Sequence, residues 1–378
     1  MLPNSRPDAS EPPVGGPSAR DVRFRGALSR LVRRQDLSRE DAAAVMTDIM
    51  DGVLAPSQMG AFLAALAGKG ETVDELVGLA EVMRRRAQPV HVPAAIADRV
   101  IDTCGTGGSG QTTLNTSTLV AFVVAAAGIP VAKHGNRASS GKCGSIDVLE
   151  HLGMPVALAS ERVAETIEAL GIGFMFAPLF HPGLRHVGPV RRELGIRTTF
   201  NFLGPLANPA GARRQLLGVS DPERAPRMLD ALRALGSTHV IVVHGADGLD
   251  EITTTGDTRV WMLKGGQVKE TVIVPKDLGL HAASAEEVSG GEVHENAELF
   301  VAVLKNEAPA PLLDLVALNA AAAFVVAEEA DDWAAGLARA RKILATQKAH
   351  RLFERYREMA SVIVHRGGAS EGRGGAQP

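Results

Sequence analysis

The sequence predicts an α/β protein: a small N-terminal helical domain precedes a large α/β domain with a largely parallel central sheet. Two observations support this fold. From about residue 22 to residue 88, apolar residues recur at helical spacing without a strand signal. Beyond Pro93, short apolar runs alternate with glycine turns and longer helical stretches. The chain has 378 residues, and at roughly 150 residues per domain this length suits two or three domains.

Capping signals divide the first domain, expected over 22–92, into helices. Ser38 precedes a helical first turn, and Thr72 with Glu75 has the spacing of a strict capping box. Ser57 is a third candidate N-cap. The first domain is therefore predicted to be a small helical bundle.

The second domain, expected over 94–365, alternates strands with helices. Strands are predicted at 239–244, 259–264 and 268–273, with a helix over 222–235 before the first of them. The segment 174–203 shows no strand alternation, and we expect it to form helices that pack back on the first domain. Other apolar runs and helical stretches fall at 99–103, 119–127, 130–133, 148–152, 163–170, 297–304 and 312–330.

The composition excludes several classes of protein. A net charge of −3 provides no global basic field for nucleic acid or an anionic membrane. The longest apolar run, 119–132, is 14 residues and too short to cross a bilayer. Cys104 and Cys143 suit neither a disulfide framework nor a metal quartet. We expect a cytoplasmic protein with no nucleic-acid or membrane partner, and disordered ends over 1–20 and 366–378.

A glycine-rich loop is the first candidate site. In DTCGTGGSGQTTLNTST (102–118), four glycines follow a predicted strand, and a polar series that includes Asn115, Ser117 and Thr118 opens an apolar helix. Glycines let backbone N–H groups approach an anion, and the helix N-terminus adds partial positive charge. The pattern is neither the nucleotide P-loop nor the dinucleotide fingerprint. Phosphate binding is favoured over a turn without a chemical role.

A second loop follows the next predicted strand. KHGNRASSGKCGSIDVLEHLG (133–153) places Lys133, Arg137 and Lys142 among glycines and hydroxyl side chains. Lysine and arginine with serine hydroxyls can neutralise a pyrophosphate. The alternative is a basic surface turn.

Two further segments have weaker signals. In PVRRELGIRTTFNFLGPLANP (189–209), Arg191 or Arg192 could hold a carboxylate, although an arginine pair more often lies on a solvated helix face. In GADGLDEIT (245–253), the adjacent Asp250 and Glu251 suit Mg²⁺, which takes one or two carboxylates plus substrate phosphates. Alone, such an acidic pair is more often a solvated loop.

In this order, the segments resemble the anthranilate phosphoribosyltransferase family of tryptophan biosynthesis. The resemblance covers roughly residues 25–360. It implies a homodimer formed through the small helical domain, with catalysis in a hinge cleft between the two domains. The implied reaction transfers the phosphoribosyl group of 5-phosphoribosyl 1-pyrophosphate (PRPP) to the amine of anthranilate, with Mg²⁺ as cofactor. The motifs that carry the resemblance are GTGG (105–108), NTST (115–118), KHGNR (133–137), VRRELGIRT (190–198), FNFLGPLANP (200–209) and DGLDE (247–251).

The resemblance also implies the site residues. Mg²⁺ ligands fall on Ser117, Asp250 and Glu251, and anthranilate contacts fall on Gly105, Asn136 and Arg191. Lys133 and Arg191 would position the substrates and stabilise charge, and no catalytic base is expected because the aromatic amine is already a nucleophile. The PRPP contacts fall on Gly105, Gly108, Ser109, Thr113, Asn115, Thr116, Ser117, Thr118, Lys133, His134, Gly135, Asn136, Arg137, Ala138, Ser139, Ser140, Gly141 and Ser145.

Two departures and two alternative functions accompany this resemblance. Ser109 stands where the family usually has Asp, which bears on metal handling, and Cys143 stands where serine is common. A pyrimidine nucleoside phosphorylase shares the fold and a GTGG-type loop but differs at the second motif. A silent paralogue that binds nucleic acid would need a basic stripe. Turnover of PRPP with anthranilate, compared with thymidine and phosphate, tests the first alternative, and a salt-dependent gel shift tests the second.

Overall fold

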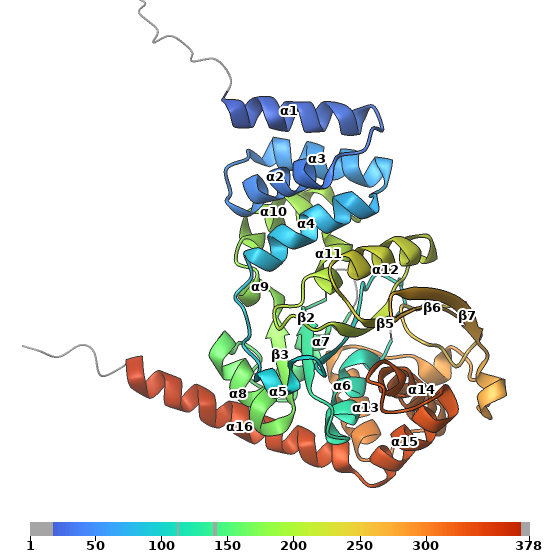
Figure 1. Cartoon of the computed structure of the whole chain (residues 1–378). Helices are drawn as coiled ribbons and strands as arrows, with labels where there is room; N and C mark the ends of the chain where they lie inside the picture. The colour runs from blue at the N-terminus through green and yellow to red at the C-terminus, as the bar shows by residue number, and fades with distance from the viewer. Residues whose placement is uncertain (1–17, 112, 139–141, 372–378) are drawn as a thin grey trace, which may run out of the picture.

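A seven-stranded sheet forms the centre of the molecule (Figure 1). This computed structural model describes residues 18–111, 113–138 and 142–371. The strand order is β3-β2-β1-β4-β5-β6-β7, with β1 to β5 parallel and β6 and β7 antiparallel at one edge, so the predicted largely parallel sheet is confirmed. The strands are β1 (Ile101–Gly105), β2 (Val131–Gly135), β3 (Ile172–Phe176), β4 (Arg214–Gly218), β5 (His239–Gly245), β6 (Thr258–Lys264) and β7 (Gln267–Ile273).

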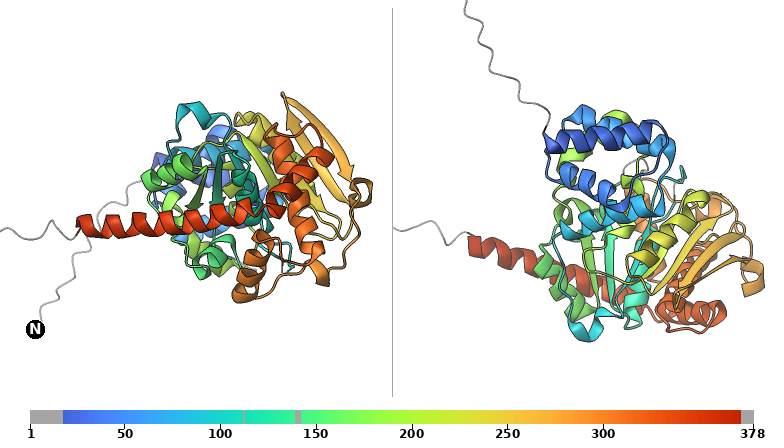
Figure 2. Two further views of the ribbon diagram at one scale, coloured as in Figure 1. Left: turned by 90° about the horizontal axis from the view of Figure 1, so that it is seen from below. Right: turned by 45° about the horizontal axis from the view of Figure 1, so that its top comes forward.

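Helices cover both faces of the sheet, which explains why β1, β2 and β3 are buried along almost their whole length. Helices α6 and α14 pack against β1, and α12 packs against β5 and β6 (Figure 1). The long helix α16 extends beyond the body of the molecule (Figure 2). The helices are α5 (Ala94–Ala97), α6 (Thr116–Ala126), α7 (Ser145–His151), α8 (Ser160–Leu170), α9 (Ala177–Phe180), α11 (Phe200–Leu206), η1 (Pro222–Arg224), α12 (Ala225–Ala234), η2 (Pro275–Leu278), η3 (Glu286–Val288), α13 (Val293–Leu304), α14 (Ala310–Val326), α15 (Trp333–Ala345) and α16 (Lys348–Glu371).

The N-terminal helices form the predicted small domain. The Ser38 hydroxyl accepts the N–H of Asp41 at 3.1 Å, and Thr72 and Glu75 form a reciprocal capping box. Ser57 is not an N-cap: the third helix begins one residue earlier, at Pro56, because proline is well suited to the first helical position. The helices are α1 (Ala19–Val32), α2 (Arg39–Met50), α3 (Pro56–Lys69), α4 (Val73–Arg85) and, from later in the chain, α10 (Leu184–Leu194), which packs on α2 and α3.

The small domain and one face of the sheet share a hydrophobic core. Buried side chains of α1 to α4 form one cluster with Phe202 of α11 and Met228 of α12, and this cluster continues to Leu217 of β4 and Trp261 of β6. The other face of the sheet has its own core, built largely from α6, α14 and α16. Apolar packing therefore continues across the junction between the helical domain and the sheet.

Several expectations from the sequence differ from the structure. The segment 174–203 begins within β3, so its first residues are a strand rather than a helix. Helix α1 begins at Ala19 with Ser18 as its cap, inside the range expected to be disordered, and α16 continues from Arg366 to Glu371. Residues 1–17 and 372–378 lie outside the described ranges. Among the residues that the structure describes, every helix is too short or too polar to span a bilayer.

Candidate active site

The carboxyl ends of β1, β2, β4 and β5 meet at one edge of the sheet. After β1 the chain builds β2 and β3 on one side, and it then returns to build β4 and β5 on the other. Ligands of open α/β sheets bind at such a switch point, outside the carboxyl ends of the strands. The glycine loop, the second loop and the acidic pair all follow strands that end at this edge.

The glycine loop leaves β1 in a conformation that requires glycine. Gly107, Gly108 and Gly110 have φ values of 65°, 80° and 75°, in the left-handed region. The N–H of Gly107 donates to Asp250 Oδ2 at 2.7 Å. A Cβ at Gly105 would lie 2.6 Å from the same oxygen, so the acidic loop approaches this backbone closely. The structure thus joins two segments that are far apart in the sequence.

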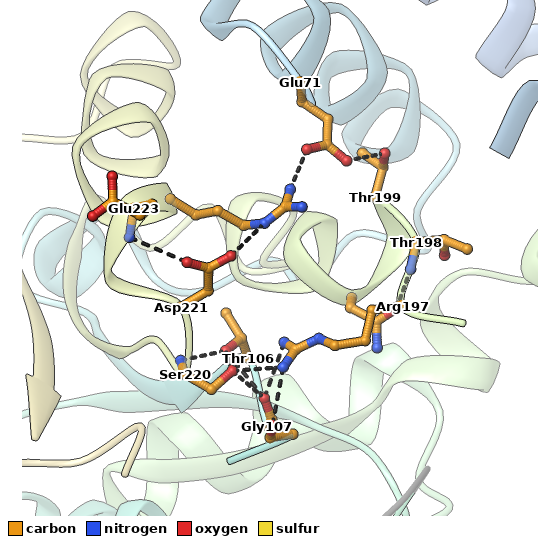
Figure 3. A network of polar contacts seen from close by, with 12 residues as sticks. Glu71, Thr106, Gly107, Arg197, Thr198, Thr199, Ser220, Asp221 and Glu223 are labelled. Atoms are coloured by element: carbon orange, nitrogen blue, oxygen red, sulfur yellow. Dashed lines mark hydrogen bonds and ion pairs between the residues drawn. The ribbon is translucent and has the colours of Figure 1, made fainter. Parts of the chain in front are cut away.

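Arg197 and Ser220 hold the glycine loop from the side of α10 and β4 (Figure 3). Arg197 Nη1 donates to the Gly108 carbonyl at 3.0 Å, and Nη2 donates to the Gly107 carbonyl at 3.2 Å. The Ser220 hydroxyl also donates to the Gly107 carbonyl, at 2.9 Å. At the far end of the loop, Gln111 Nε2 donates to the Asp247 carbonyl.

The polar residues that lead into the first turn of α6 differ in burial. Thr116 and Thr118 are buried, so their hydroxyls lie in the core. Thr113 and Ser117 are partly exposed, as is Asn115, whose amide bonds the carbonyl of Cys143 in the second loop at 3.3 Å. The N–H groups of Thr116 and Thr118 already donate to the carbonyls of Leu114 and Asn115, at 2.8 and 3.0 Å, whereas the buried Thr118 hydroxyl has no partner among the described residues.

Lys133 lies beneath this loop rather than in solvent. Its side chain is buried, and Nζ donates to Ser117 Oγ at 3.0 Å and to the Thr103 carbonyl. Burial lowers the pKa of Lys133, while the Asp102, Cys104 and Glu251 side chains oppose that shift. Lys133 thus supplies positive charge from inside the protein, next to Ser117.

The acidic pair fits a divalent cation. Burial raises the pKa of Asp250, and burial together with the Asp250 charge raises the pKa of Glu251 to about 8, against the opposing effects of Lys133 and the Ser117 N–H. A cation would relieve the repulsion between these carboxyl groups. No group of three or more His, Cys, Asp or Glu side chains within the described residues could hold a metal by itself. This set suits Mg²⁺, which completes its coordination with waters and phosphate oxygens.

The second loop is ordered by residues other than its cations. Ser145 Oγ donates to the Asn136 carbonyl at 3.2 Å, and Asp147 Oδ2 accepts the N–H groups of Ala138 and Gly144 at 2.9 and 2.8 Å. Asn136, Arg137 and Ala138 are exposed, and Gly135 is partly exposed. Predicted contacts Ser139, Ser140 and Gly141 lie outside the described residues.

The cations of this loop pair with acidic residues. Arg137 binds Glu150 through two nitrogens, at 3.1 and 2.7 Å, and Lys142 pairs with Glu292 at 2.8 Å. Lys133, Arg137 and Lys142 thus each have a partner within the protein, and the neutralisation of a pyrophosphate by cations of this loop stays a prediction.

His134 is a buried neutral residue at the end of β2. Its Nδ1 lies 3.2 Å from the Gly204 carbonyl, and its ring centroid lies 5.0 Å from that of His181. Burial lowers the pKa of His134 to about 4. At neutral pH it therefore contributes shape and hydrogen bonding rather than charge.

Arg191 is a cation near the end of α10. Its guanidinium lies 5.5 Å from the centroid of the Phe200 ring. Burial lowers its pKa, and no acidic side chain of the described residues opposes that shift. A partly buried arginine of this kind is suited to bind a carboxylate from outside the protein. Arg192, the other candidate, is exposed.

Four residues that shape this site were given no role in the sequence analysis. Arg197 and Ser220 hold the glycine loop, and Asp147 orders the second loop. Asp247 organises the acidic loop, where its carboxylate accepts the hydroxyls of Thr253 and Thr255, both at 2.5 Å. Arg197, Asp147 and Asp247 lie within the segments that the sequence singled out, so their position was a usable signal. Nothing in the sequence indicated a role for Ser220, because β4, the strand that precedes it, was not predicted.

Comparisons with known proteins identify the family of this chain. Residues 97–350 match the model of the glycosyl transferase family, a/b domain, and residues 25–87 match that of its helical bundle domain. Anthranilate phosphoribosyltransferase from Chloroflexus aggregans is 47% identical over 342 residues, which cover 90% of this chain and 98% of that protein. The protein of that name from Anaeromyxobacter sp. strain K is 52% identical, over 83% of this chain and 92% of that protein.

Solved structures extend the comparison to bound ligands. Anthranilate phosphoribosyltransferase from Thermus thermophilus superposes with a TM-score of 0.83 at 43% identity, covering 89% of this chain and 99% of that one. The Saccharomyces cerevisiae enzyme in complex with PRPP and Mg also gives 0.83, at 26% identity and over 90% and 99% of the two chains. The same yeast enzyme in complex with 4-fluoroanthranilate gives 0.81, at 25% identity and over 90% and 98%.

Proposed function

The chain belongs to the anthranilate phosphoribosyltransferase family, and from this premise we propose that it transfers the phosphoribosyl group of PRPP to the amine of anthranilate. The products would be N-(5-phosphoribosyl)anthranilate and pyrophosphate, within tryptophan biosynthesis. One observation carries the proposal: the glycine loop, the N-terminus of α6 and the acidic pair converge at one edge of the sheet. Such a site can receive a pyrophosphate together with its metal ion.

PRPP would bind along the glycine loop and the start of α6. The donors would be the backbone N–H groups of Gly108 and Ser109 together with the partly exposed Asn115 and Ser117, and the second loop would add Asn136 and Ser145. Buried Lys133 would contribute charge through Ser117 rather than by direct contact. Asp250, Glu251 and Ser117 would hold Mg²⁺, which when bound neutralises charge on the pyrophosphate.

Anthranilate would bind next to Arg191. Its carboxylate supplies the charge that no described acidic residue provides to this guanidinium, and the Phe200 ring limits where the guanidinium can move. Asn136 and Gly105 would complete this side of the site, with His134 nearby. Because Arg191 presents a planar fork of donors, it would also orient the ring of the substrate.

The proposed reaction needs positioning more than a catalytic base. The bond from the anomeric carbon to pyrophosphate breaks, the bond to the amine nitrogen forms, and the amine then loses its proton. Negative charge builds on the departing pyrophosphate, so fixed N–H groups and cations there stabilise the transition state more than the bound substrate. Holding the amine close to the anomeric carbon supplies much of the remaining rate.

A fluorescence assay tests the proposal. Anthranilate fluorescence should fall when PRPP and Mg²⁺ are added together to the purified chain, and it should stay constant when either is omitted. Constant fluorescence under all conditions would contradict the proposal.

We further propose a cytoplasmic homodimer that associates through the small helical domain. The resemblance to the family implies an interface in this domain, where α1 exposes Val22 and Val32. Both Cys104 and Cys143 are free thiols, as in reducing compartments. Light scattering of the purified chain should give twice the mass of one chain; a single-chain mass would contradict the dimer.

A further inference from the structure

The backbone of the glycine loop is held by one arginine. Arg197 donates to the carbonyls of both Gly107 and Gly108, and its Nη1 also donates to Ser220 Oγ at 2.8 Å (Figure 3). A Cβ at residue 108 would lie 2.6 Å from Arg197 Nη1, so this contact requires glycine there. Arginine makes these bonds through two nitrogens of one planar group, and the single ammonium nitrogen of lysine cannot occupy both positions.

These bonds fix two peptide planes. In a trans peptide, the carbonyl of one residue and the N–H of the next point in opposite directions. With the Gly107 and Gly108 carbonyls directed at Arg197, the N–H groups of Gly108 and Ser109 point away from the guanidinium. Consecutive N–H groups beside left-handed residues form a concavity suited to anions, and Gly107 and Gly108 both have positive φ.

The same segment is tied to the small domain. Two residues after Arg197, Thr199 Oγ1 donates to Glu71 Oε1 at 2.5 Å, and Glu71 is a buried residue between α3 and α4. Glu71 also forms an ion pair with Arg224, which bonds Asp221 at 3.0 Å (Figure 3). A chain of contacts therefore runs from the small domain through residues 197–199 to the glycine loop.

We propose that Arg197 is a positioning residue: it orients the glycine-loop N–H groups toward the pyrophosphate of PRPP, and Glu71 makes this orientation depend on the small domain. This inference rests on the proposed function. Arg197 differs from the residues expected to touch substrate, because the three acceptors of its hydrogen bonds all belong to the protein.

The first test measures amide hydrogen exchange of residues 104–111 in the ligand-free protein. Arg197→Gln and Arg197→Lys should both speed exchange of the loop, including the Gly107 amide that bonds Asp250. Ser220→Ala, a milder change, should act in the same direction. The control is Arg213→Gln, because Arg213 also donates to a glycine carbonyl, that of Gly236 at 2.8 Å, but at the opposite end of β4. Loop exchange equal to wild type in the Arg197 variants would overturn the proposal.

The second test uses steady-state kinetics. Arg197→Gln and Arg197→Lys should raise the PRPP KM at least tenfold and the anthranilate KM less than threefold, whereas Arg213→Gln should change neither. If Arg197→Lys restores the PRPP KM while exchange of its glycine loop stays fast, charge alone suffices and the positioning role is wrong. Absence of turnover by the wild-type chain would refute the proposed function. The exchange experiment needs no turnover, so it would still show whether Arg197 orders the glycine loop.

A separate variant tests whether the glycine loop depends on the small domain. Thr199→Val keeps the shape of the side chain and removes the hydroxyl that donates to Glu71. Loop exchange should increase, by less than in Arg197→Gln, and the PRPP KM should rise with it. Loop exchange identical to wild type would overturn the dependence on the small domain.

Discussion

Arg191 is the residue whose surroundings most directly predict a substrate contact. Burial lowers its pKa without an opposing acidic group among the described residues. Losing a charge-assisted hydrogen bond costs about 1.5–3 kcal/mol. Arg191→Ala should therefore raise the anthranilate KM by roughly ten- to a hundredfold, at 1.4 kcal/mol per decade. The PRPP KM should change much less.

The neighbouring Arg192 provides the control for this prediction. It is exposed on the same helix, so Arg192→Ala should leave both KM values near wild type. Steady-state assays with each substrate varied in turn measure the effect. An equal loss for both substrates in Arg191→Ala would assign Arg191 a structural role instead.

Ser109 is one of the two residues at which the resemblance to the family predicts a different side chain, here aspartate. Aspartate there would face the pyrophosphate, and two unit charges about 4 Å apart interact by roughly 4 kcal/mol at an effective dielectric near 20. Ser109→Asp should therefore weaken PRPP binding at low Mg²⁺ and make binding depend more steeply on the metal. A magnesium titration of PRPP affinity for both proteins measures this. Superimposable curves would show that the side chain at position 109 does not affect how PRPP binding depends on Mg²⁺.

Residue types were easier to predict than side-chain directions. The sequence singled out the cations Lys133 and Arg137, but Lys133 points into the core toward Ser117 and Arg137 pairs with Glu150. The spacing of residues in a loop does not determine which side chains face inward. Glu150 is thirteen residues from Arg137, so their contact depends on how α7 returns toward β2.

At the scale of elements, the loop that follows β5 combines two functions. Asp250 accepts the Gly107 N–H, and with Glu251 it forms the candidate metal site. The double variant Asp250→Asn with Glu251→Gln retains amide oxygens that can accept hydrogen bonds but removes both charges. It should raise the PRPP KM, and excess Mg²⁺ should partly reverse the loss.

Two measurements check the acidic-loop prediction. Circular dichroism should remain native, because the changed residues lie in a loop and keep their size. Activity should be compared at limiting and at saturating Mg²⁺. Full activity of the double variant at limiting Mg²⁺ would show that the two carboxylates do not hold the metal.

The predicted strands were those with a clear local signal. The strands at β5, β6 and β7 were predicted within a residue or two of their observed bounds. In contrast, β3 reads IGFMF and is buried on both faces, so it shows no alternation that separates it from a buried helix. β4 begins with the polar residues Arg214 and Gln215, so it lacks the apolar run that indicates a buried strand. Hydrogen bonds from these two side chains to distant backbone carbonyls stabilise the strand instead.

At the scale of the whole molecule, a pair of buried histidines lies where the small domain meets the sheet. His181 follows α9, and its ring lies 5.0 Å from that of His134. Burial and the nearby His134 lower the pKa of His181 to about 3, although the backbone of Met83 in α4 and of Ala207 opposes the shift. The fold therefore favours the neutral form of both rings.

This pair predicts how stability depends on pH. The unfolded chain binds protons on these histidines below about pH 6.5, whereas the folded chain binds them only near pH 4 and pH 3. Each histidine therefore contributes stability that is complete above pH 6.5 and is lost as pH falls toward its folded pKa. Within that window the loss approaches about 1.4 kcal/mol per pH unit for each group.

Urea unfolding between pH 4.5 and pH 7.5 tests this dependence. Carboxyl groups also respond to acid, so the measurement compares variants rather than absolute values. His181→Gln should lower stability at neutral pH, yet it should lose less on acidification than wild type because one titrating group is gone. His281→Gln, at an exposed residue, should keep the wild-type slope. Parallel curves for wild type and His181→Gln would show that protonation of His181 does not oppose folding.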